Sequence, residues 1–389
     1  MGLFDDWGQV ATVTIDKDKV PSNLTNFPVH IPKSVLPDSM FDADGSNPAL
    51  NGGGDIRFTP DAAGTARLAV EVVFFVTDND PANGEAGLTV KVPSISSSVD
   101  TLIYLWFNKA AQSQPARDAA FGIEAAWNNG YVLVQRFNQS PGAGAPQLID
   151  STASNFDGTA TAAGATLVDG AVGKAWDLPS ASQVRLSHTT DSALAFERTD
   201  PFTFEMVLAD DATPGFAFLM TRNRSSTPFR GYQMSQHSGK IYFLLQNDNS
   251  PLNAFEMEGN TNFLLDGNPH YITCTYDGSQ VIGGMNIFKD GIVDTPYNII
   301  TNNLSGTIVF TPAPNFYICG EGRNIEHYDG PVSEARVSSV ERSADWVATT
   351  QETLMAPGTF VSVGVPSYPD VIGSRFRRGL EFGMRLGVR

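Results

Sequence analysis

Apolar and polar residues alternate over short stretches in the first part of the chain, as they do in strands that bury one face. Turn residues such as the glycines at 52–54 separate these stretches. The pattern predicts strands at residues 10–15, 27–31, 56–58, 68–76, 88–92 and 101–107. Strands of this length and spacing are typical of a β-sandwich. The pattern changes between 110 and 127, so we place the end of a first domain near residue 130.

A second and longer series of strands follows, almost without helical periodicity. The predicted strands lie at 131–137, 175–178, 183–186, 202–208, 216–222, 232–235, 240–245, 270–276, 285–289, 307–310, 315–319 and 330–338. Two large packed sheets are the natural way to bury so many strands. A short helix is predicted near 343–350, because Ser343 is a suitable N-cap and Asp345 suits the first turn.

Composition favours a folded protein with many turns. The chain of 389 residues has 36 Gly and 24 Pro, too few for a disordered low-complexity protein but suited to many short loops. Its 25 Phe residues can fill a sizeable core. The two cysteines, Cys274 and Cys319, cannot form a disulfide framework, so we predict buried reduced thiols and leave a single bridge open.

The charge of the chain restricts its partners. The net charge of −17 repels phosphate backbones and disfavours nucleic acid as a partner. No run of 18 apolar residues is present, so membrane insertion is not expected, and the N-terminus has no secretory signal pattern. Residues 371–389 differ from the rest, because arginines there alternate with large apolar residues.

The first half resembles a known family. Trp7 is followed in order by matching segments at 14–16, 20–21, 24–29, 55–59, 90–93, 95–97 and 100–104. Together they are similar to a bacterial and phage domain of unknown function that commonly precedes laminin-G-like modules.

The second half of the chain resembles another known family. Matching segments lie at 150–152, 170–175, 202–205, 270–271, 276–278, 288–291, 317–337, 343–346 and 360–364. In this order they are similar to the laminin-G-like, concanavalin A-like jelly roll. The fold expected is therefore all-β: an N-terminal β-sandwich with a connector at 1–130, a jelly-roll sandwich at 131–365, and a short basic tail at 366–389.

The resemblance also implies a candidate calcium site, although no cofactor is required. Relatives bind Ca²⁺ through acidic residues, and hard oxygen ligands on a loop suit this ion. The candidate ligands are Asp150, Asn155, Asp157 and Glu334. The site is weakened because Ser333 stands where one acid is usual and Asn138-Gln139 stand at another acidic position. An Asx turn at 150–157 is the favoured alternative.

Catalytic motifs are missing. Glycoside hydrolysis on a jelly roll usually uses Glu-x-Asp-x-x-Glu along one strand, which does not occur here. Glu256 and Glu258 alternate correctly but have no third acid, so a solvated strand edge is favoured for them. No Gly-x-Ser-x-Gly elbow exists, and His270 is expected to be a structural strand residue. The protein is therefore expected not to be an enzyme.

Carbohydrate binding is the alternative chemistry of this fold. Aromatic, amide and charged residues on predicted loops are the candidate contacts: Asn223, Arg224, Phe229, Arg230, Tyr232, Asn247, Asp248, Glu321, Arg323 and Asn324. For each of them an ordinary surface position is the competing interpretation.

The function expected from these observations is that of a non-enzymatic structural protein of a phage virion, in a tail, a fibre or a capsid decoration. It would assemble in the host cytoplasm, form homo-oligomers, contact other virion proteins and bind a glycan of the host surface. A secreted or cell-surface bacterial adhesin is the alternative, and a polysaccharide-degrading enzyme is a weaker one. Residues of the basic tail are the expected attachment contacts: Arg375, Phe376, Arg377, Arg378, Phe382 and Arg385.

Overall fold

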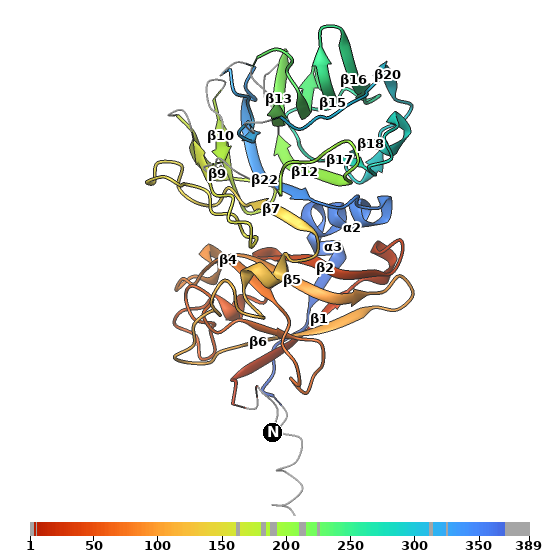
Figure 1. The fold of residues 1–389 in the computed structure, drawn as a ribbon. Coiled ribbons are helices and arrows are strands. Elements are labelled where there is room, and N and C mark those ends of the chain that lie inside the picture. Colours follow the sequence, from red (N-terminus) through yellow and green to blue (C-terminus); the bar gives the residue numbers. More distant parts are fainter. Residues whose placement is uncertain are drawn as a thin grey trace, which may run out of the picture.

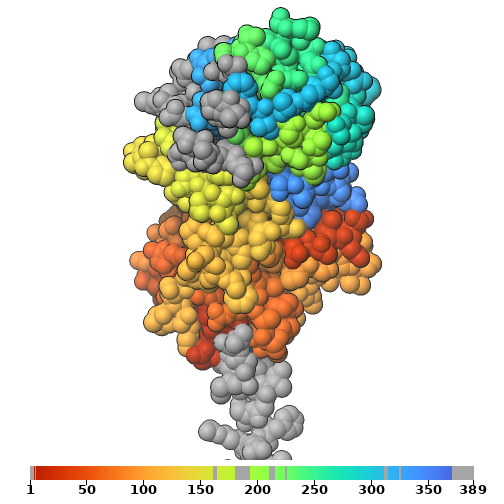
Figure 2. Space-filling model, viewed as in Figure 1, coloured from red at the N-terminus to blue at the C-terminus, as the bar shows by residue number. Residues whose placement is uncertain are grey.

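The computed structural model describes residues 4, 6–160, 164–179, 184–186, 193–209, 215–223, 226–310, 314–323 and 326–369, with the side chains of 184–186 left out. In this part of the chain two β-sandwiches lie one above the other (Figure 1). The space-filling view shows the same two lobes, with the blue segment of residues 344–360 at the waist between them (Figure 2). The expected all-β fold is confirmed. The predicted attachment residues of the tail lie outside the described residues.

The first sandwich has one sheet of order β23-β1-β6-β3 and a facing sheet of order β2-β5-β4. Its strands are β1 (Gln9–Ile15), β2 (Leu24–Pro32), β3 (Arg57–Thr59), β4 (Val70–Val76), β5 (Glu85–Ile95), β6 (Thr101–Phe107) and β23 (Val361–Val363). Alternation is clear on β1, where Val13 and Ile15 are buried and Thr14 between them is half-buried. The buried faces of both sheets form one core.

The second sandwich is larger. Its front sheet has the order β20-β16-β15-β14-β13-β21-β11-β8. These strands are β8 (Gly158–Ala160), β11 (Val184–Leu186), β13 (Phe216–Asn223), β14 (Gly231–His237), β15 (Lys240–Asn249), β16 (Leu252–Glu258), β20 (Asn298–Asn302) and β21 (Tyr317–Ile318). Aromatic and aliphatic side chains from both sheets fill the core between them.

The back sheet has the order β19-β18-β17-β12-β22-β10-β9, and β7 also pairs with β22. These strands are β7 (Tyr131–Gln135), β9 (Thr166–Asp169), β10 (Lys174–Leu178), β12 (Phe202–Ala209), β17 (Pro269–Tyr276), β18 (Met285–Lys289), β19 (Ile292–Val293) and β22 (Gly330–Ser338). The outer face of this sheet is turned toward the first sandwich, with β7 and β22 nearest to it (Figure 1).

The end of the described chain returns to the first sandwich. Helix α2 (Ala344–Met355) leads into α3 (Pro357–Phe360) and then into β23, which pairs antiparallel with β1. The Oγ of Ser343 accepts a hydrogen bond from the backbone amide of Trp346, as expected of an N-cap. Sequence analysis placed residues up to 365 with the second unit, but β23 completes a sheet of the first, because Phe360 and Val361 belong to its core.

Helix α2 lies between the two sandwiches because it is buried on two sides. Trp346 packs against Phe27 of β2, with ring centres 4.8 Å apart. On the other side, Val347 and Leu354 pack against the back sheet in a cluster with Tyr271. The short helix α1 (Ile123–Ala126) lies in the connector before β7.

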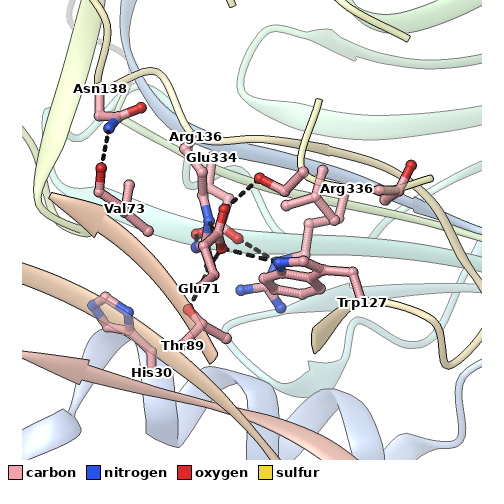
Figure 3. A network of polar contacts seen from close by, with 12 residues as sticks. His30, Glu71, Val73, Thr89, Trp127, Arg136, Asn138, Glu334 and Arg336 are labelled. Atoms are coloured by element: carbon pink, nitrogen blue, oxygen red, sulfur yellow. Dashed lines mark hydrogen bonds and ion pairs between the residues drawn. The ribbon is translucent and has the colours of Figure 1, made fainter. Parts of the chain in front are cut away.

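A buried network of charges joins the two sandwiches (Figure 3). Arg136, just after β7, forms ion pairs with Glu71 of β4 at 2.8 Å and with Glu334 of β22 at 2.6 Å. Glu334 also pairs with Arg336. Both guanidinium groups lie against the ring of Trp127, at 4.8 Å and 5.0 Å from its centre. Burial opposes ionisation of Glu334, but the two arginines hold its pKa below the ordinary value.

The same network uses neutral groups to complete its hydrogen bonds. The indole nitrogen of Trp127 donates to Glu71 at 2.9 Å, and the hydroxyl of Ser151 donates to the other oxygen of that carboxylate. Thr89 accepts a hydrogen bond from Arg136. Removing one member of such a set leaves uncompensated charge in the interior, which makes these residues strongly interdependent.

Two further expectations can be compared with the structure. Cys274 and Cys319 are buried and not bonded to each other, so the prediction of free thiols is confirmed. Residues 307–310 were predicted to be a strand and are not one. The backbone amides of Ile308 and Val309 donate to the carboxylate of Glu197 instead of to a neighbouring strand.

Candidate functional site

The second sandwich has its two sheets in different surroundings. The outer face of the back sheet is covered by α2 and by the first sandwich. On the outer face of the front sheet, strands β13, β14 and β15 border an open hollow of about 300 Å³. This feature, called the front hollow below, is the candidate functional site.

Neighbouring strands and two loops supply the lining of the front hollow. The described lining residues are Phe216, Phe218 and Asn223 of β13, Phe229 of the following loop, Gln233 of β14, Leu244, Gln246 and Asn249 of β15, and Arg323 and Glu326 after β21. Side chains two positions apart on a strand point to one face, so Phe216 projects with Phe218, and Leu244 with Gln246. The residues between them face the core.

Amide side chains form the polar part of the front hollow. The Nδ2 of Asn223 donates to the Oε1 of Gln233 at 3.2 Å, and the Nε2 of Gln246 donates to a backbone carbonyl at 3.4 Å. Each amide has two N–H donors and an acceptor oxygen, so these bonds leave further capacity for a ligand. Asn249 is exposed at the end of β15.

Phe229 and Arg323 form the aromatic and cationic part. The guanidinium carbon of Arg323 lies 5.2 Å from the ring centre of Phe229. The Nε of Arg323 donates to the buried carboxylate of Glu321 at 2.9 Å, which fixes the guanidinium. Phe229 has a φ of +54°, a left-handed conformation that bulky residues rarely adopt. Residues held in such conformations concentrate at functional sites, because the surrounding structure must impose them.

Part of the predicted carbohydrate-binding set comes together here. Asn223, Phe229 and Arg323 line the front hollow, and Glu321 holds Arg323 in place from the interior. Two further candidates lie outside the described residues: Arg224 and Asn324.

The other candidates lie elsewhere. Tyr232 was expected on a surface loop, but it is only 2% exposed, because it alternates with Gln233 on β14 and faces the core. Arg230 lines a separate narrow cavity beside Tyr232, and its Nε donates to the carbonyl of Asn247 at 3.2 Å. The side chain of Asn247 donates to a backbone carbonyl at 2.6 Å, and Asp248 accepts from a backbone amide of the next turn.

The carboxylates of the candidate calcium loop accept hydrogen bonds from backbone amides of the loop and of β7. Asp150 accepts from the amides of Val134, Thr152 and Phe156 at 2.9 to 3.0 Å. Asp157 in turn accepts from the amide of Asp150 at 2.9 Å. Burial raises the pKa of Asp150 to about 6, against the effect of these hydrogen bonds. The contact from the amide of Thr152, two residues after Asp150, is that of an Asx turn.

The remaining calcium candidates have other contacts. Asn155 lies 3.4 Å from a guanidinium nitrogen of Arg117, and Glu334 is shared by the two arginines of the buried network. Among the described residues, no group of three or more His, Cys, Asp or Glu side chains is placed as metal ligands would be. Calcium binding therefore stays a prediction from the sequence.

His270, Glu256 and Glu258 were discussed in the sequence analysis, and the structure shows the surroundings of each. His270 bonds to Asp290 at 2.8 Å and to Asp266 at 3.1 Å, in keeping with a structural residue of β17. Glu256 and Glu258 were assigned to a solvated strand edge. The structure corrects this, because their strand β16 lies between β15 and β20.

Sequence analysis missed most of the hollow. It searched loops for ligand contacts, whereas the floor comes from strand residues: Phe216, Phe218, Gln233, Leu244 and Gln246. Alternation could have indicated these residues, since polar or aromatic residues that line the hollow alternate with core residues along each strand. Alternation alone does not distinguish a ligand-binding face from an ordinary solvated one.

Another hollow, of about 380 Å³, lies on the first sandwich, beside the turn after β1. Its carboxylates are used within the turn: Asp16 accepts from the amide of Asp18, and Asp100 accepts from the amide of Lys17. Asp18 in turn pairs with the side chain of Lys17. This hollow therefore offers less free hydrogen-bonding capacity than the front hollow.

None of the helices among the described residues is long and apolar enough to cross a membrane. None of the protein-family models matches the sequence, and no curated protein does.

Similar folds occur among solved structures. The binding domain of Paraclostridial Mosquitocidal Protein 1 is 12% identical over 58% of this chain and 52% of that chain, with a TM-score of 0.44. The binding domain of botulinum neurotoxin serotype D is 11% identical over 59% of this chain and 52% of that chain, with a TM-score of 0.41. The match thus spans about half the length of each of these two binding domains.

A third similar structure is domain 4 of an extracellular arabinanase from Geobacillus stearothermophilus, in complex with arabinotriose. It is 15% identical over 56% of this chain and 96% of that chain, with a TM-score of 0.40. At these identities the likeness of all three concerns the fold alone.

Proposed function

We propose that the protein binds a carbohydrate in the front hollow. The observation that carries this proposal is the combination of aromatic rings and amides in one open hollow. A sugar ring has apolar C–H faces, which pack well against a ring such as Phe229. Its hydroxyl groups both donate and accept hydrogen bonds, as the amides of Gln233 and Gln246 do. A pocket that pairs apolar surface with a few polar groups is the usual form of a ligand site.

Binding without cleavage is the second part of the proposal. Hydrolysis of a glycosidic bond uses two carboxyl groups about 5–10 Å apart, one on each side of the bond. Among the described residues that line the hollow, Glu326 is the single carboxylic acid. Glu321 lies behind Arg323, where its carboxylate bonds to that side chain. This distribution supports a binding site.

The finer form of the proposal is a phage virion protein that binds a host-surface glycan and assembles with copies of itself. It depends on the resemblance of the sequence, and the tail expected to mediate attachment is described only up to residue 369. The binding proposal does not require it, because the front hollow belongs to one chain.

The test is binding to an array of bacterial surface polysaccharides and their oligosaccharide fragments. We expect retention of a subset of these glycans by the full chain. Phe229→Ala and Gln246→Ala should each weaken the affinity about tenfold or more, which corresponds to about 1.4 kcal/mol. Ile292→Ala is the control, because Ile292 is 73% exposed on β19 at the edge of the other sheet.

Circular dichroism of each variant establishes that it is folded. If no glycan on the array is retained, or if both hollow variants bind like the unmodified chain, the front hollow is not a carbohydrate site. Release of reducing sugar from a bound polysaccharide would contradict the second part of the proposal.

A further inference from the structure

The polar face of the front sheet continues beyond the hollow. Gln233 of β14 stands opposite Leu244 of β15, and Leu244 stands opposite Glu256 of β16. Directly opposed residues of antiparallel strands point to the same face, so these three form a row that starts in the hollow. Strands β15 and β16 neighbour each other in the second sandwich (Figure 1). With strands about 4.8 Å apart, Gln233 and Glu256 are separated by about 10 Å, more than the width of one sugar ring.

Glu256 differs from the other acid on its strand. The carboxylate of Glu258 accepts from the Nδ2 of Asn298 at 2.9 Å and pairs with Lys240 at 3.3 Å. Glu256 is half-buried, and its carboxylate has no hydrogen bond or ion pair with any described residue. Burial raises the pKa of Glu256, as expected of an acid without a partner. A ligand hydroxyl that donates to such a carboxylate makes a stronger hydrogen bond than it makes to a neutral acceptor.

The charges along this row disfavour an anionic ligand. Arg323 is the one cation among the described residues that line the hollow. Its charge is compensated by Glu321 at 2.9 Å and by Glu326 at 3.8 Å. Glu256 adds a further negative charge at the far end of the row. An acidic sugar placed here would face carboxylates without a free cation among the described lining residues, and like charges in such positions oppose binding.

We propose that the site takes a neutral oligosaccharide of at least two rings, with one ring beside Gln233 in the front hollow and the next at the Leu244 border of the hollow, where its hydroxyls donate to Glu256. This inference depends on the proposed function and specifies its ligand class. It assigns a positioning and specificity role to Glu256, which does not line the hollow itself.

The test uses titration calorimetry with linear neutral oligosaccharides of one to four hexose or deoxyhexose units and with oligogalacturonic acids of the same lengths. We expect at least tenfold tighter binding of a neutral chain of two or more units than of its monosaccharide, and no binding of the acids. Glu256→Ala should abolish the gain with chain length and leave monosaccharide affinity unchanged. Glu258→Ala is the matched control: it removes the same charge from the same face of β16 and should retain the gain.

The outcomes separate this inference from the proposal on which it depends. A gain with chain length that survives Glu256→Ala, or binding of oligogalacturonic acids with equal affinity, overturns the inference and leaves carbohydrate binding in the hollow intact. Monosaccharides that bind as tightly as longer chains overturn it as well. If no sugar of either series binds and the array is also blank, the proposed function itself fails.

Discussion

The two outer faces of the second sandwich carry polar residues in similar alternating patterns, but one face is buried and the other borders an open hollow. On the back sheet, Glu334 and Arg336 of β22 are buried, and their charges are paired with each other and with Arg136. On the front sheet, Gln246 lines an open hollow, and Glu256 has no hydrogen bond or ion pair with any described residue.

The difference shows what distinguishes a structural polar group from a candidate ligand contact. A polar group that folding buries must find its partners inside the protein, since an unpaired one costs stability. The back face meets this condition because a second sandwich lies against it and provides Glu71. Over β13 to β15 the front face borders an open hollow, with no second sandwich against it among the described residues.

The largest expected effect concerns the buried network. Arg136→Met leaves Glu71 and Glu334 without their shared cation in the interior, so the free energy of unfolding should fall by about 3–5 kcal/mol. The control is Lys174→Met, because Lys174 also bridges one carboxylate of each sandwich, Glu85 at 2.7 Å and Asp169 at 2.9 Å, but at the surface.

The control should lose only about 0–1 kcal/mol, as exposed ion pairs do. Urea unfolding of both variants measures the contrast. Equal losses in the two variants would show that burial does not determine how much these ion pairs contribute to the free energy of unfolding. The comparison between the covered and the open face would then have no basis.

The next effect concerns the helix that covers the back face. Leu354 of α2 is 1% exposed and packs in the cluster with Tyr271 and Val347. Leu354→Ala should therefore cost about 2–5 kcal/mol, because it leaves a cavity between the helix and the sheet. Leu252→Ala on the front sheet should change stability by about 0.5 kcal/mol or less, since Leu252 is 40% exposed. Thermal unfolding gives both values, and a Leu354→Ala variant as stable as its control would mean that α2 does not hold the back face.

The smallest effect concerns two glutamates with opposite pKa shifts. Burial raises the pKa of Glu256, so the folded state binds its proton more tightly than the unfolded state does. That contribution to stability is present below the ordinary pKa of 4.5 and is lost as the pH rises through the raised value. Glu256→Gln avoids this loss, so it should be more stable than the unmodified chain by about 0.5 kcal/mol or less at neutral pH.

The gain should disappear at about pH 4, near the ordinary range of a carboxyl group. For Glu334 the sign is reversed, because its pKa is lowered: its contribution is present above 4.5 and is lost as the pH falls through the lowered value. The difference in melting temperature between the unmodified chain and Glu256→Gln across this range tests the statement on Glu256. A difference between the two proteins that does not change with pH would contradict the assignment for Glu256.

The fold was largely predictable from the sequence, whereas the site was predictable only in part. Asn223, Phe229 and Arg323 were candidates from their residue types and meet in one hollow. Tyr232 was a candidate too, yet it faces the core, while its neighbour Gln233 lines the front hollow. One position along a strand reverses the face, and nothing in a single residue's type says which face is inward.

Glu334 and Glu256 show the limit of prediction from the sequence most directly. The sequence led us to assign the first to calcium and the second to a solvated edge. Glu334 instead pairs with Arg136 and Arg336 in the buried network between the two sandwiches. Glu256 lies within the front sheet, because its strand β16 is between β15 and β20. Both outcomes depend on strands and partners that are distant along the chain.

By itself, then, the sequence determined the features that follow from local physics: the all-β fold, the positions of most strands, the Ser343 cap and the two unpaired thiols. Strand alternation and capping involve residues a few positions apart, and their pattern can be seen in the chain. The tertiary structure alone decided that β23 returns to pair with β1 and that the back sheet is covered while the front hollow stays open. The physical reason is that burial and ion pairing depend on which distant surfaces come together, and alternation is the same on a covered face and on an open one.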